Sequence, residues 1–134
     1  MLGKKKHPPI KSLIAQGTRI EGNVQFSDGL RIDGEVVGDI RASDEKSSIL
    51  VISELAKVTG QVHADHVIIN GMVKGPVFAY DLLELQPKAS IEGDVSYKAL
   101  EMHQGATIAG QLKPMAGGVV IEEKAPLKLA ANNS

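Results

Sequence analysis

Apolar and polar residues alternate along short stretches of the chain, and a glycine recurs in the middle of each stretch. In the run from Ile20 to Val24, the two aliphatic residues and Gly22 are two positions apart. In a β-strand they would share one face, while Glu21 and Asn23 would share the other. This apolar-x-Gly-x-apolar unit occurs six times, at 20–24, 32–36, 58–62, 69–73, 91–95 and 108–112.

The units recur along the chain with a period of roughly 17 residues, and a fixed period is the signature of a repeat architecture. Gly93 and Gly110 are separated by one such step, and Gly60 and Gly93 by close to two. Between Gly22 and Gly60 the chain covers two steps and leaves a few residues over. The polar segment 42–48 accommodates these extra residues as a loop.

A repeat of this length has room for three short strands separated by bends, which make one coil of a β-solenoid. We therefore predict an all-β, three-sided parallel β-helix of five to six coils, roughly 25–30 Å long at a coil spacing of about 4.8 Å. A sandwich or barrel would not repeat a glycine unit in one frame. A left-handed hexapeptide helix would keep a six-residue step, which this chain does not.

Composition and charge narrow the function classes. The chain has 134 residues, 43% of them hydrophobic, but only two Phe, two Tyr and no Trp, so the core is expected to consist of small aliphatic side chains. Cysteine is absent, which fits a reducing, cytoplasmic compartment. The net charge of −1 argues against a nucleic-acid partner. The longest run of large aliphatics, 49–52, is far too short to cross a membrane.

Charge and proline content divide the chain into three parts. Residues 1–11 contain Lys4, Lys5, Lys6 and a Pro-Pro pair, and are predicted to form a flexible basic arm. Residues 12–112 hold the repeats and form the β-helix domain. Residues 113–134 form a C-terminal tail in which 119–121 is a candidate short strand.

The order and spacing of these units resemble the bactofilin family of bacterial cytoskeletal proteins. The resemblance rests on the runs 12–22, 30–40 and 67–75 and on the unit 91–95, and it covers 12–112. The segment from Pro114 to Ile121 is similar to the ending of the subset involved in curved or helical cell shape.

The resemblance implies a right-handed, three-sided β-helix that polymerises end to end without nucleotide. It implies filaments in the bacterial cytoplasm, often beneath the inner membrane. It also implies a scaffold for peptidoglycan synthases or hydrolases and other cell-shape proteins, and thereby a role in morphogenesis.

The two end coils are the candidate polymerisation surfaces, because they carry the same inward aliphatic residues as the middle coils and no visible amphipathic cap. The alternative is a monomeric binding module in which residues 10–15 or 115–121 fold back as caps. The candidate polymerisation residues are Ile20, Val24, Phe26, Leu100, Met102, Ile108 and Leu112.

The N-terminal arm is a candidate membrane-association element. Met1 and Leu2 could insert into lipid while Lys4, Lys5 and Lys6 meet anionic headgroups, each contributing about 1 kcal/mol near such a surface. The alternative is a solvated run of charge.

No catalytic, cofactor or metal constellation is visible, so we expect neither an enzyme nor a bound cofactor. His63 and His66 resemble a short metal motif, but strict alternation would place them on opposite faces, as surface histidines. Some right-handed β-helices are polysaccharide lyases. However, the carboxylates here (Asp33, Glu35, Asp39, Glu92 and Asp94) are interleaved with Lys and Arg, and are expected to form a solvated face. No phosphate-binding glycine loop precedes a helix.

Overall fold

The computed structural model describes residues 8–43 and 47–122, with side chains up to Met115, and this part of the chain contains strands and no helix. The strands are β1 (Ile10–Ile14), β2 (Arg19–Glu21), β3 (Val24–Phe26), β4 (Gly29–Ile32), β5 (Glu35–Val37), β6 (Ile40–Ala42), β7 (Ile49–Ile52), β8 (Lys57–Thr59), β9 (Val62–Ile69), β10 (Met72–Lys74), β11 (Val77–Leu85), β12 (Ser90–Glu92), β13 (Val95–Met102), β14 (Thr107–Ala109) and β15 (Leu112–Glu122).

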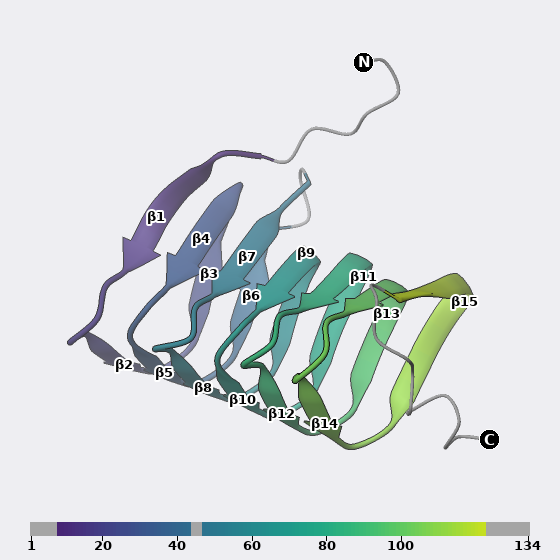
Figure 1. The fold of residues 1–134 in the computed structure, drawn as a ribbon. Helices are drawn as coiled ribbons and strands as arrows, with labels where there is room; N and C mark the ends of the chain where they lie inside the picture. The colour runs from purple at the N-terminus through teal and green to yellow at the C-terminus, as the bar shows by residue number, and fades with distance from the viewer. Residues whose placement is uncertain (1–7, 44–46, 123–134) are drawn as a thin grey trace.

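All strand pairs in these described ranges are parallel, and the strands stack in chain order (Figure 1). One sheet has the strand order β2-β5-β8-β10-β12-β14, and the other has the order β1-β4-β7-β9-β11-β13-β15. In the second sheet β3 also pairs with β6, and β6 pairs with β9. The chain therefore winds through about six stacked turns, from β1 at one end to β15 at the other. This confirms the predicted β-solenoid of five to six coils; its right hand and three sides stay predictions.

The strands of successive coils pair in parallel ladders. In the later coils two segments join into one long strand that bends. In β9, for example, residues 62–64 pair with 77–79 of β11, and residues 66–69 pair with 82–85. The register shifts between the two halves, which marks the bend.

Inward-facing aliphatic side chains form columns that run the length of the solenoid. Val36, Val58, Val73 and Ile91, in neighbouring strands of the six-stranded sheet, are at most 1% exposed. Their outward neighbours in these strands are half-buried or exposed. This alternation drives folding, because burial of apolar area is the main favourable contribution to stability.

One inward column explains why the chain has so few aromatic residues. Ala64 and Ala79 are paired, and Ala79 pairs on its other side with Tyr97, which is 1% exposed. At the opposite end Phe26 pairs with Ala42. A ring therefore fits inside the narrow solenoid only where the stacked neighbour is an alanine or where the coil lies near an end.

The six glycine units do not occupy equivalent places, which corrects the simple single-frame repeat. Gly34 and Gly71 lie at a different bend from Gly22, Gly60, Gly93 and Gly110. Gly38 and Gly75 lie at the same bend as Gly22, Gly60, Gly93 and Gly110, because each stacks on the preceding glycine of that group. The set that follows the six-stranded sheet is therefore Gly22, Gly38, Gly60, Gly75, Gly93 and Gly110, one in each coil.

Gly60 shows why only glycine fits at this bend. Its φ of +148° lies in a region that residues with a Cβ rarely adopt. An added Cβ would also fall on the backbone carbonyl oxygen of Gly38 in the coil below. The bend therefore combines a left-handed conformation with close approach of one coil to the next.

Side chains beside the same bend link successive coils. The Asn23 Oδ1 accepts a 2.9 Å hydrogen bond from the Asp39 amide, and the Asp39 Oδ1 accepts one of the same length from the Gln61 amide. Asp94 and the Gln111 amide repeat the arrangement at 2.9 Å. These contacts satisfy backbone donors where the strand ladder is interrupted.

The insertion lies where the glycine spacing places it, between β6 and β7. Residues 44–46 lie outside the described part of the chain. Where the insertion ends, the Ser48 amide donates to the Asp65 Oδ2 at 3.1 Å, and the Asp65 amide donates to the Ser48 Oγ at 3.0 Å. This reciprocal pair fixes the chain as it re-enters the third coil, and Ser48 is accordingly buried.

The strands extend beyond the domain limits of 12 and 112. β1 begins at Ile10, within the arm assigned to 1–11, and β15 continues through 113–122, which includes the candidate strand at 119–121. Residues 1–7 and 123–134 lie outside the described part, so the flexible character of both tails stays a prediction.

Candidate self-assembly surfaces

The N-terminal end of the solenoid exposes the edges of three strands. In the described chain β1, β2 and β3 each pair on one side only, with β4, β5 and β6. The unpaired side of a strand carries main-chain donors and acceptors that can pair with another strand. β1 also carries two exposed aliphatic side chains, Ile10 and Leu13.

The C-terminal end exposes a similar set of strand edges. β14 is the last strand of the six-stranded sheet, and residues 112–114 of β15 are the last layer beside it. Residues 119–122 of β15 pair with 99–102 of β13 and begin a seventh turn. Figure 1 shows β14 and β15 as the outermost strands at this end.

The apolar columns are less covered at both ends than in the middle. Ile20 and Ile108 are half-buried, whereas the equivalent Val58 and Val73 are 0–1% exposed. Val24 and Leu112 are likewise half-buried at the two ends of another column, whose inner members, such as Val62 and Val77, are fully buried. Within the described residues, the apolar columns are therefore less buried at both ends of the solenoid than in its middle.

The structure brings five of the seven candidate polymerisation residues to the ends. Ile20, Val24 and Phe26 lie in the first coil, although Phe26 is only 8% exposed, and Ile108 and Leu112 lie in the last complete coil. The remaining two, Leu100 and Met102, are covered by one further strand segment.

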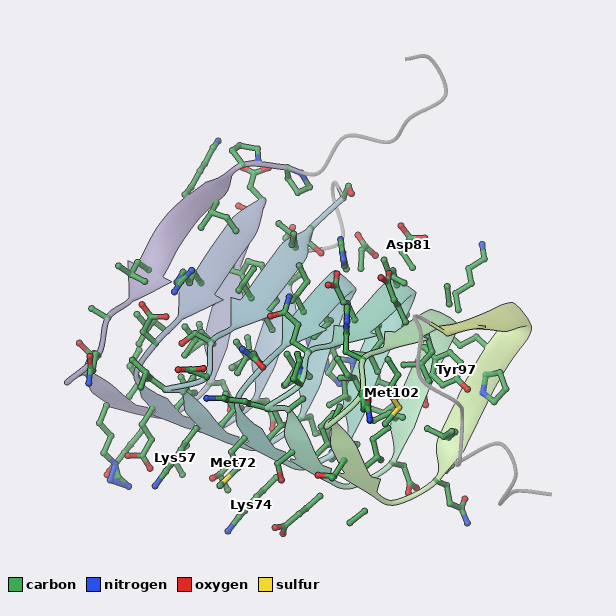
Figure 2. The ribbon with its side chains drawn as sticks, viewed as in Figure 1. Lys57, Met72, Lys74, Asp81, Tyr97 and Met102 are labelled. Atoms are coloured by element: carbon green, nitrogen blue, oxygen red, sulfur yellow. The ribbon has the colours of Figure 1, made fainter. Side chains whose placement is uncertain are left out.

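Leu100 and Met102 are in β13, which pairs with residues 119–122 of β15. Leu100 is only 1% exposed. Figure 2 shows Met102 and Tyr97 near β15, whereas Lys57, Met72 and Lys74 project away from the six-stranded sheet. The sequence could not separate these layers, because the strand at 119–121 was only a candidate.

The candidate membrane-association residues lie outside the described residues. These are Met1, Leu2, Lys4, Lys5 and Lys6. Within the part of the chain that the structure describes, no helix has the length and apolarity that a membrane crossing needs.

The prediction for the two histidines needs correction. His63 and His66 are 8% and 6% exposed, so they are not surface residues. Both point outward, because the bend at Asp65 interrupts the alternation: the core residues on either side are Ala64 and Val67. They belong to different segments of β9 and contact different residues, so the short motif itself assembles no metal site.

His63 is held by aromatic and polar neighbours. Its ring stacks on Phe78 with centroids 4.4 Å apart, and its Nδ1 lies 2.7 Å from the Tyr80 hydroxyl. Its Nε2 lies 3.0 Å from the Gln61 Oε1. Burial and the nearby Arg41 charge hold the pKa of His63 below its usual value, so the ring is neutral at neutral pH. These contacts hold the ring in place between neighbouring coils, so we assign His63 a structural role.

Two of the interleaved carboxylates, Asp33 and Asp94, form ion pairs. Asp33 pairs with Arg31 at 2.9 Å. Asp94 accepts the Gln111 amide and pairs with Lys113 at 3.1 Å, which together lower the pKa of Asp94. These contacts fit the predicted solvated face.

The sequence analysis did not predict a cluster of two glutamates and a histidine on the outer face of the sheet that contains β11 and β13. Glu84, Glu101 and His103 each offer a ligand atom, and these atoms lie within 4.8 Å of one another. The signal was present in the sequence: Glu84 and Glu101 are separated by one period of the repeat, and His103 follows two positions later.

Comparison with known proteins identifies a family for this chain. A search of curated proteins finds no match, and a search of solved structures finds none either. The family model for bactofilin, described as polymer-forming cytoskeletal, matches residues 12–113, about three quarters of the chain. The matched segment contains nearly all of the six coils. The chain therefore belongs to the bactofilin family of polymer-forming cytoskeletal proteins.

Proposed function

We propose that this chain forms filaments by joining the end coils of successive subunits, without nucleotide. The observation that carries the proposal is the lower burial at the ends: within the described residues, half-buried aliphatic side chains and strands paired on one side only occur at both ends of the solenoid. Complete burial of a Val, Leu or Ile side chain contributes about 1.5–3 kcal/mol. End-to-end contact would extend these columns and pair the strand edges.

The filament acts as a scaffold in this proposal, not as an enzyme. Its place is the cytoplasmic side of the bacterial inner membrane, where it organises cell-wall synthases or hydrolases and thereby sets cell shape. The support for this is the family of the chain and the ending from Pro114 to Ile121, which is similar to that of the curvature-determining subset.

Negative-stain microscopy of the purified full chain, in buffer free of nucleotide, tests the proposed assembly. We expect filaments whose formation is unchanged when ATP or GTP is added. A uniform population of monomers by sedimentation, under all conditions tested, would instead favour a monomeric binding module with covered ends.

The basic arm supplies the membrane contact in this proposal. A single arm with three lysines binds weakly, at about 1 kcal/mol per lysine, but a filament displays many arms and multivalency strengthens the attachment. We expect the full chain to pellet with anionic liposomes and residues 10–134 to stay in the supernatant. Equal pelleting of both proteins would show that the arm is a solvated charge run.

A further inference from the structure

Two glutamates and a histidine converge on the outer face of the sheet that ends at β15. Glu84 lies in β11 and Glu101 in β13, directly paired in the parallel register. His103 follows β13 at once, so that it lies beside both. The His103 Nε2 is 3.6 Å from the Glu84 Oε2 and 4.0 Å from the Glu101 Oε2.

The stacking of Glu84 on Glu101 is unfavourable by itself. Two like charges that face each other on neighbouring strands destabilise a sheet. The two side chains are only 21% and 27% exposed, so water screens the repulsion incompletely. A cation placed between the carboxylates would convert this repulsion into attraction.

The spacing of the three groups approaches that of ligands around one metal ion. Ligand atoms at 2.0–2.1 Å from a tetrahedral zinc ion are about 3.4 Å apart. The separations of 3.6 and 4.0 Å are slightly wider, and they exceed the 2.7–3.2 Å of an ordinary N–H···O hydrogen bond. All three ligand atoms lie within 4.8 Å of one another, so binding of an ion requires these partly exposed side chains to move closer together.

Two neighbours orient Glu84 toward this position. The Gln86 Nε2 donates to the Glu84 Oε2 at 3.3 Å. The His66 ring, whose side chain is 8% exposed, lies with its Nε2 3.9 Å from the other carboxylate oxygen, Oε1. Groups that hold the ligands in place in this way raise the affinity of a metal site.

From this geometry we propose that Glu84, Glu101 and His103 bind one divalent transition-metal ion, of the zinc class, per chain. The imidazole selects for this class over Mg²⁺ and Ca²⁺, which take all-oxygen ligand sets. The ion joins the fifth coil to the sixth, next to the C-terminal end of the solenoid. The proposal is independent of the assembly mechanism.

Equilibrium dialysis of the full chain against Zn²⁺ tests the site, since it is insensitive to the assembly state. We expect saturable binding of one Zn²⁺ per chain and no comparable binding of Mg²⁺. His103→Ala and the isosteric Glu101→Gln are each expected to raise the dissociation constant at least about tenfold. Far-UV circular dichroism checks that each variant is folded.

Glu92→Gln is the matched control, because Glu92 is an exposed carboxylate in β12 of the other sheet. It is expected to bind Zn²⁺ like the wild-type chain. The proposal is overturned if the wild-type chain shows no saturable Zn²⁺ binding. It is equally overturned if Glu101→Gln binds with an unchanged dissociation constant, which would place the ion elsewhere.

Discussion

Ile108→Asp is expected to abolish filaments while leaving the solenoid folded. Ile108 lies in the terminal strand β14, and within the described residues it packs against the core from its inner side, on Ile91. A carboxylate here would have to be desolvated when a second subunit covers it, which costs several kcal/mol unless it is paired. In the free subunit it can remain hydrated, and a change in the last repeat leaves the other coil contacts intact.

The experiment compares Ile108→Asp with Thr107→Asp by negative-stain microscopy and sedimentation. Thr107 is exposed in the same strand, so its carboxylate adds the same charge without entering the apolar column. Leu112→Asp, in the neighbouring column, is expected to behave like Ile108→Asp. Normal filaments from both Ile108→Asp and Leu112→Asp would show that the C-terminal coil is not part of the contact between subunits.

Gly60→Ala is expected to destabilise the folded chain by more than about 4 kcal/mol, an effect that only severe steric or packing damage produces. Two costs combine at this position. A residue with a Cβ at a φ of +148° is strained by about 1–3 kcal/mol. The added methyl group also overlaps the carbonyl oxygen of Gly38, and neither backbone can move without breaking the coil contact.

Gly22→Ala isolates the first of these costs. Gly22 has a φ of +137°, but an added Cβ there meets no atom within 4 Å, because no coil lies below it in the described subunit. We expect a loss of only about 1–3 kcal/mol. Urea unfolding in the Ile108→Asp background compares the two, since assembly then adds no stability. Equal losses would mean that the close approach of the coils contributes nothing.

The coil-by-coil fold could be predicted because each repeat solves the same packing problem. Burial of an aliphatic column demands an apolar residue at a fixed place in every coil, and the close bend demands Gly60 and its equivalents. These requirements leave a period in the sequence. The family resemblance rests on the same residues.

Three features could not be predicted from the sequence: the orientation of the two histidines, the pairing of the two glutamates and the inner position of Leu100. Each depends on where the strands bend or end. Alternation alone put His63 and His66 on opposite faces, but the bend at Asp65 resets it and turns both outward. The pairing of Glu84 with Glu101 likewise needs the register of neighbouring coils, which shifts at the bend between Ala79 and Leu82. The inner position of Leu100 follows from β15, whose partner segment 119–122 lies after the recognisable repeats.

The orientation of the subunit within the filament tests the central claim most directly. Six coils at a spacing of about 4.8 Å give each subunit a length of roughly 29 Å along the solenoid axis. If subunits join through their end coils, electron cryo-microscopy will show a coil spacing of about 4.8 Å along the filament axis. The axial subunit repeat will then equal the length of one subunit, or twice that length if subunits alternate in direction. A filament in which the coils stack perpendicular to its axis would mean that subunits associate side by side, and would contradict the account.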